Sequence, residues 1–169
     1  MTEPRELVRM AAELDHAVRG TPWHGNALMK ILEGTTAAEA FAHPIAGAHS
    51  IWELVLHMTA WTHETTHRLR GGVPGEPGDG DFPNVPQAAT GPHWEAAQAR
   101  LLSAHDALLA TIRRLDPAEL DARPIPGKAG EFGVGVKHRV LVHGLSQHHA
   151  YHGGQIALLR RALQASATP

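Results

Sequence analysis

The 169-residue chain contains no cysteine. This absence excludes disulfide bonds, a thiolate metal site and a cysteine nucleophile. Any metal ligand or reactive group in the chain must therefore come from another kind of side chain.

Long apolar runs are also missing. No stretch approaches the roughly 18 consecutive apolar residues that a membrane-spanning helix needs. The first residues, Met1 to Glu6, show no cationic segment that leads into a long apolar one, so no secretion signal is visible. Hydrophobic residues make up 43% of the chain and charged residues 19%, which is typical of a globular protein. We expect a cytoplasmic protein with no membrane partner, folded as one domain over residues 1–169.

The chain has little excess charge of either sign. Its formal net charge is −2, so it has no basic surface of the kind that holds nucleic acid. We therefore expect no nucleic-acid partner, and DNA binding is disfavoured. Histidine, by contrast, is abundant, with 14 residues against 15 lysines and arginines together. Most of these histidines must be surface residues or helix caps, so their positions decide which of them act.

The apolar pattern predicts an all-α fold. Apolar residues recur at three- and four-residue steps along residues 6–32, 51–69, 94–115 and 138–165, with a break at Gly20-Thr21-Pro22. Ser50, followed by Glu53, predicts the start of the second helix. Residues 71–92 and 120–136 are rich in glycine and proline, which predicts long connections. We expect a four-helix bundle with long crossover connections.

Two histidines of the last helix, His148 and His152, lie one turn apart inside its apolar stripe. A buried imidazole without a partner is unfavourable, because its two ring nitrogens need hydrogen bonds or a metal ion. Histidines at positions i and i+4 can bind one ion together, or they can be two hydrogen-bonded core residues. His149 falls on the rim of the stripe, so we expect it outside the ligand set.

Two further histidines are predicted to point toward apolar surroundings. His57 lies at the edge of the apolar stripe of helix 51–69 and is the best candidate for a third ligand. His24 lies within about 40° of Leu28 and Ile31 if residues 23–32 are helical. It could act as a general base, contact a substrate or be a hydrogen-bonded core histidine. We predict a catalytic role for His24.

Neighbours of these histidines allow two interpretations each. Gln155 could orient His152 through its distal ring nitrogen, or it could cap the backbone of another helix. Glu64 could support His57, but we interpret it as a solvated charge. The glycines at 153 and 154 cost about 1 kcal/mol each relative to alanine inside a helix. This cost predicts that another helix or a substrate approaches closely there.

These motifs resemble those of the DinB/YfiT-like family of metal-binding four-helix bundles. The similarity covers nearly the whole chain and is carried by Trp23-His24-Gly25, residues 50–57, Asp81-Phe82-Pro83 and, most strongly, residues 147–156. In that family one histidine of the second helix and two histidines four residues apart on the fourth helix hold a metal ion. The resemblance implies that His57, His148 and His152 hold one divalent ion, with zinc or nickel expected.

The resemblance leaves the reaction open. Members of the family are described as metal-dependent hydrolases or as transferases that use low-molecular-weight thiols. We expect a metal-dependent enzyme of one of these types, acting on a small molecule and forming a homodimer as in relatives. The alternative is a non-catalytic metal- or small-ligand-binding bundle linked to the stress response. The two differ in the openness of the site, because a catalytic ion needs a free coordination position.

Overall fold

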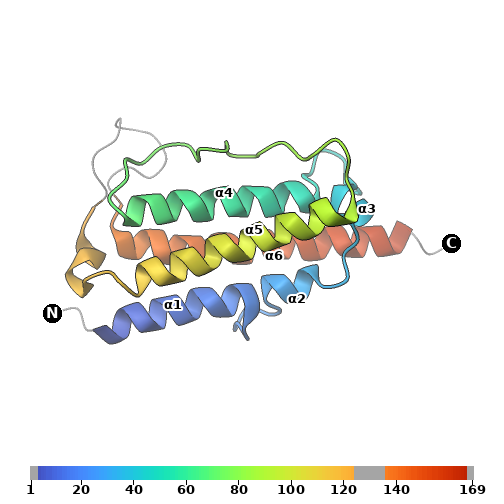
Figure 1. Cartoon of the computed structure of the whole chain (residues 1–169). Helices are drawn as coiled ribbons and strands as arrows, with labels where there is room; N and C mark the ends of the chain where they lie inside the picture. The colour runs from blue at the N-terminus through green and yellow to red at the C-terminus, as the bar shows by residue number, and fades with distance from the viewer. Residues whose placement is uncertain (1–3, 124–135, 167–169) are drawn as a thin grey trace.

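The computed structural model of the chain describes residues 4–123 and 136–166, and these residues form an all-helical bundle (Figure 1). No strand occurs in the two described ranges. The helices are α1 (Pro4–Arg19), α2 (Leu28–Leu32), α3 (Ala37–Phe41), α4 (Ile51–Leu69), α5 (Gly91–Ile112) and α6 (His138–Ser166), with a 3₁₀ helix η1 at Pro117–Asp121. The predicted all-α class is confirmed.

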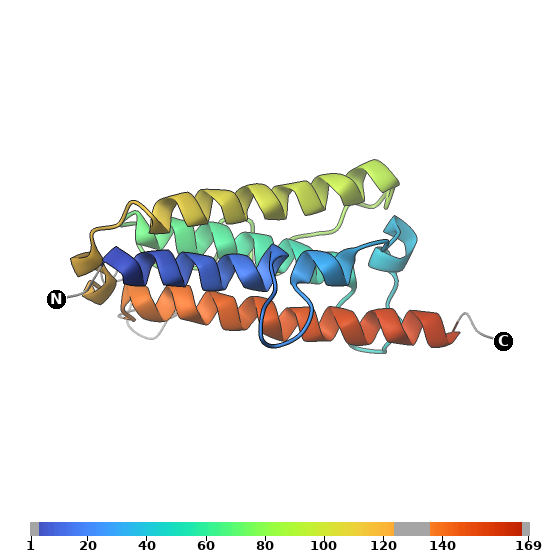
Figure 2. The same cartoon turned by 90° about the horizontal axis from the view of Figure 1, so that it is seen from below.

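Helix α2 continues the line of α1 (Figure 2), so that α1 with α2, α4, α5 and α6 form the four positions of the bundle. The connection formed by residues 70–90 runs the length of the bundle, so that α4 and α5 lie parallel to each other (Figure 1). Helix α6 runs antiparallel to both of them. The long connection between α4 and α5 is therefore a crossover, as the sequence predicted. Residues 124–135, which belong to the second predicted connection, lie outside the described residues.

The start of α4 is held by a capping box, as its sequence predicted. The Ser50 hydroxyl accepts a hydrogen bond from the Glu53 backbone N–H at 3.2 Å, and the Glu53 carboxylate accepts one from the Ser50 N–H at 2.6 Å. These bonds satisfy two backbone donors that a helix N-terminus would otherwise leave unpaired. They also fix the register of the helix that carries His57.

The hydrophobic core has two parts. One surrounds Trp52 and Trp94 at the α2 and α3 end of the bundle. The other surrounds Leu14 and Leu108 at the α1 and η1 end. Between the two parts the helices bury polar side chains, which include Thr62, His105, His149 and His152. These buried polar side chains form a polar middle layer of the bundle.

The segment before α2 differs from its prediction. Residues 20–27 form a loop, and only Leu28–Leu32 is helical. Gly25 has a φ of 132°, a value that no helix contains, and Pro22 lacks a backbone N–H to donate. Trp23 is fully exposed at 102%, and His24 beside it is also exposed. The expectation that His24 faces the apolar interior is therefore wrong.

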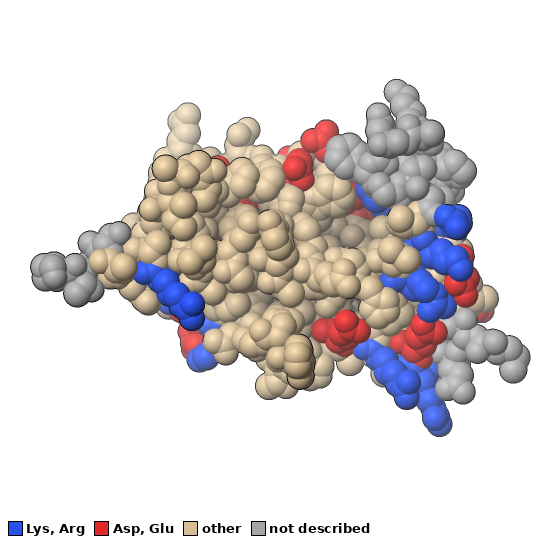
Figure 3. All heavy atoms as spheres, turned by 180° about the vertical axis from the view of Figure 1, so that it is seen from behind, with Lys and Arg blue, Asp and Glu red and all other residues tan. Residues whose placement is uncertain are grey.

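The face of the bundle that carries α6 has few charges in its middle. Seen from behind in Figure 3, the Lys and Arg side chains gather toward the two ends of the molecule. Among the described residues, no helix is both long and apolar enough to cross a membrane.

The buried His105 leads to a prediction about pH. His105 is completely buried on α5, and its Nε2–H donates to Asp15 at 3.0 Å. Burial lowers the pKa of His105 below its usual 6.5, although the Asp15 carboxylate raises it. The unfolded chain therefore binds more protons near pH 6, so that folding stability falls as the pH drops below 6.5.

We expect His105→Gln to make stability less sensitive to pH, because glutamine can keep the donor to Asp15 but does not titrate. Between pH 7.5 and 5.5 the wild type should lose up to about 1.4 kcal/mol more unfolding free energy than this variant. Urea denaturation in the presence of a chelator measures both proteins. Equal losses in the two would contradict the assignment of His105 as a neutral buried group.

Candidate metal centre

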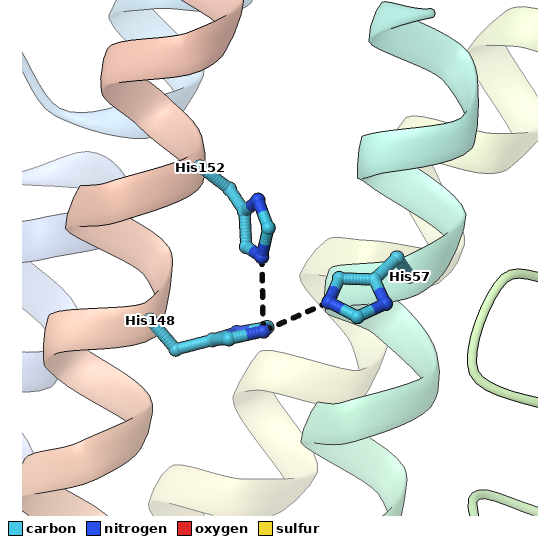
Figure 4. A group of neighbouring side chains, drawn as sticks. All are labelled: His57, His148 and His152. Carbon is cyan, nitrogen blue, oxygen red and sulfur yellow. Dashed lines mark hydrogen bonds between the residues drawn. The ribbon is translucent and has the colours of Figure 1, made fainter. Parts of the chain in front are cut away.

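Helices α4 and α6 bring His57, His148 and His152 together at their shared seam (Figure 4). His57 and His148 are 91 residues apart in the sequence, yet their Nε2 atoms are 2.9 Å apart. The Nε2 atoms of His148 and His152 are 3.1 Å apart across one helical turn. One nitrogen of each residue therefore faces the same small volume, and the three could hold a metal ion.

The distances from His148 Nε2 to the other two nitrogens are compatible with a single ion, and all three nitrogens lie within 4.8 Å of one another. Zinc binds imidazole nitrogen at roughly 2.0–2.1 Å, so two ligands at a tetrahedral angle lie about 3.3 Å apart. The observed separations of 2.9 and 3.1 Å fall slightly below this value. Small rotations of the imidazole rings would make the three nitrogens a coordination set.

The tautomers of two of the rings are set by their other nitrogen. His57 Nδ1 lies 2.6 Å from the backbone oxygen of Asp81, and His152 Nδ1 lies 2.6 Å from the side-chain oxygen of Gln155. Both partner atoms are acceptors only, so each Nδ1 carries the proton and each Nε2 presents a lone pair. Of the two interpretations left open for Gln155, the structure shows the contact with His152.

With the protons placed in this way, the three facing nitrogens have too few hydrogen-bond donors for their lone pairs. His148 Nε2 faces both lone pairs and can donate one proton at most. If His148 carries its proton on Nδ1 instead, three lone pairs converge. In either case an acceptor stays without a donor inside the cluster, and a cation is the partner that would satisfy all three.

Burial keeps two of the rings in the neutral form that a metal ion needs. Burial, together with repulsion from positive charge on His152 and His57, lowers the pKa of His148 to about 3. Burial also lowers the pKa of His152, which the hydrogen bond to Gln155 opposes. Metal ions bind neutral imidazole, so both residues are ready to act as ligands at neutral pH.

The crossover connection supplies support to His57 that the sequence analysis missed. The Asp81 carboxylate lies 3.2 Å from His57 Nδ1 and accepts a hydrogen bond from Trp61 Nε1 at 2.7 Å. The Phe82 ring stacks on the His57 ring, with the two ring centroids 4.1 Å apart. The other face of Phe82 stacks on the His49 ring, with a centroid distance of 3.8 Å. These contacts fix the orientation of His57, because they hold its ring from the edge and from one face.

Two other buried polar residues, His149 and Glu64, differ from their predictions. His149 is buried at 1% exposure instead of lying on the rim, and its Nε2 contacts the Thr62 hydroxyl at 3.2 Å. Glu64 is 7% exposed and is not a solvated charge, because it accepts bonds from Arg68 at 2.7 Å and from the Gly75 N–H at 3.1 Å. Tertiary packing covers both positions, which a helical wheel cannot show. His149 stays outside the ligand cluster, as expected.

His24 lies on another flank of α6. It lines a hollow with His149, Gly153, Gly154 and Arg161, and in the described structure no contact joins it to the three clustered histidines. Its catalytic role stays a prediction. At Gly153 a Cβ would lie 3.4 Å from the terminal side-chain carbon of Ile31, which is ordinary van der Waals contact, and at Gly154 it would meet no atom within 4 Å. The predicted close approach is therefore absent at Gly154, and at Gly153 it does not require a glycine.

Comparison with known protein families places the chain in a family. The family description DinB superfamily matches residues 22–156, a range that contains His57, His148 and His152. No curated protein matches the chain, and no solved structure does. The match covers well over half of the chain and agrees with the all-helical fold. This chain belongs to the DinB superfamily.

Proposed function

We propose that His57, His148 and His152 bind one divalent metal ion and that this ion makes the protein a metal-dependent enzyme. The observation that carries the proposal is the convergence of three Nε2 atoms, two of which have their lone pairs fixed toward one point. Superfamily membership supports it independently. Imidazole ligands suit zinc and nickel, and we expect one of these ions.

The openness of the site favours catalysis over a purely structural ion. Three protein ligands leave at least one coordination position free, whereas structural zinc sites are closed by four. His148 is only half-buried and lines a surface hollow together with Trp61 and Leu145. A small molecule could therefore reach the ion from that side. A non-catalytic bundle, in which the ion ties α4 to α6, is the competing function.

In this proposal the ion would act as a Lewis acid, and the side chains around it would orient its ligands. A bound ion would supply a Lewis acid that lowers the pKa of a water molecule or of a substrate thiol, which serves a hydrolase and a thiol transferase alike. Asp81 and Gln155 hold the protons of His57 and His152 on Nδ1 and so keep each Nε2 free to bind. Phe82 shields one face of His57 from water.

Metal content tests the proposal first. The wild type, stripped with chelator and reloaded with zinc or nickel, should hold one ion per chain by elemental analysis. His148→Ala should bind at least about a hundredfold more weakly, because it removes a ligand outright and even the hydrogen-bond partners of ligands contribute up to about a hundredfold. His63→Ala is the matched control, because His63 is exposed on α4 and belongs to no group of potential metal ligands among the described residues. A metal-free wild type, or equal binding by His148→Ala, would contradict the proposal.

Catalysis is tested by a screen of low-molecular-weight thiols with electrophiles and of small hydrolysable esters and amides. We expect turnover that disappears with chelator, returns with the ion and is absent in His148→Ala. Turnover that persists in this variant would rule out the ion as the catalyst. A protein that binds the ion tightly and turns over no compound would favour the non-catalytic function instead.

The contact between Asp81 and His57 predicts a further effect on metal affinity. Asp81→Ala should weaken binding about tenfold, because hydrogen-bond partners of metal-bound histidines typically contribute tenfold to a hundredfold and the Asp81 backbone oxygen remains. Competition with a chromophoric chelator measures the change. Asp79→Ala is the control, since Asp79 is exposed in the same connection and pairs with Arg100 at 3.4 Å. Unchanged affinity in Asp81→Ala would show that its carboxylate does not position His57.

A further inference from the structure

A hollow of about 200 Å³ opens directly beside the histidine cluster, on the Trp61 side of the α4–α6 seam. Its lining includes Trp61, Thr65, Leu141, Gly144, Leu145 and His148. His148 thus belongs both to the candidate ligand set and to the wall of this hollow. The hollow reaches the cluster through His148, so a molecule seated in it would lie against one of the three candidate ligands.

The wall of the hollow is mainly apolar and carries no net charge. Trp61, Leu141 and Leu145 provide carbon surface. The one charged side chain in the lining, Arg68, pairs with Glu64 at 2.7 Å, and both are buried. An apolar group placed here would leave water at little electrostatic cost, and its transfer is favourable in proportion to the area buried.

The charge at the cluster points to an anion. The three imidazoles are expected to be neutral as ligands, so the +2 charge of a bound ion would not be balanced by them. Asp81 is the carboxylate nearest the cluster among the described contacts, and it faces His57 on the side away from Nε2. An anionic group on the free coordination position would supply the missing charge.

We propose that this hollow receives the apolar tail of a small anionic molecule whose head binds the ion. This inference rests on the proposed metal centre and names the class of substrate that the centre would take. An apolar cavity of about 150 Å³ can hold benzene, so a hollow of about 200 Å³ is large enough for one ring or a short alkyl chain.

Gly144 keeps the hollow open and offers a way to close it. A Cβ added at Gly144 would meet no atom within 4 Å, so the position has open space into which a longer side chain can extend. Glycine is also a weak helix former, so a substitution should not unfold α6. Gly154 is the matched control, because it lies on the same helix, has equally open space and lines a different hollow.

The experiment compares acetohydroxamate with benzohydroxamate, which share a metal-binding head and differ in their tails. Both are titrated into cobalt-loaded wild type, Gly144→Leu and Gly154→Leu, and binding is followed by the cobalt absorption spectrum. We expect the wild type and Gly154→Leu to prefer benzohydroxamate by at least about tenfold. Gly144→Leu should lose this preference and keep its affinity for acetohydroxamate.

The outcomes separate this inference from the proposed function. If the metal is bound and acetohydroxamate binds, but the wild type shows no preference for the ring, the hollow does not select an apolar tail. If Gly144→Leu keeps the preference, the tail lies elsewhere. Val140→Asn, which places a polar group on an exposed position of the same hollow, should reduce the preference if Gly144→Leu does not fold. A protein that holds no cobalt at all would overturn the metal centre itself.

Discussion

The convergence of three imidazole nitrogens at the α4–α6 seam is the constraint on which the rest of the site depends. Burying an imidazole is unfavourable unless both of its nitrogens have partners. His57 and His152 each use Nδ1 as a donor to a protein oxygen, which leaves two lone pairs aimed at His148. The protein thus places a polar, electron-rich cluster between the two parts of its hydrophobic core.

Because of the crossover topology, the segment between α4 and α5 passes beside this cluster and contacts His57. Because α4 and α5 run parallel, the chain between them must return along the full length of the bundle (Figure 1). On the way it contacts one face of α4 at successive turns, where it meets Arg68 and Glu64 through Gly75 and then His57 through Asp81. The same segment therefore forms hydrogen bonds to α4 that stabilise the fold, and it orients a candidate ligand. A simple hairpin connection could not do both.

Helical periodicity predicted the fold and the ligand candidates because both depend on local order. The i and i+4 spacing of His148 and His152 fixes their common direction once α6 forms, and the position of His57 on α4 follows in the same way. The capping box at Ser50 set the start of α4 to the residue. These features are encoded within single helices, so the sequence alone contains them.

Other parts of the site depend on contacts that no helical wheel contains. Asp81 and Phe82 reach His57 from a segment without periodicity, so only their place in a family motif marked them before the structure was known. His24 was misplaced because Gly25 ends any helical geometry before α2 begins. Glu64 did carry a usable signal, since Arg68 stands four residues later, a spacing at which opposite charges pair on a helix.

A crystal structure of the zinc-loaded protein tests whether the three Nε2 atoms share one ion. We expect a single anomalous peak between α4 and α6, with His57, His148 and His152 bound through Nε2 at about 2.0–2.1 Å and a non-protein ligand completing the shell. An ion bound elsewhere, or three histidines that stay hydrogen-bonded to one another in the presence of excess zinc, would contradict it.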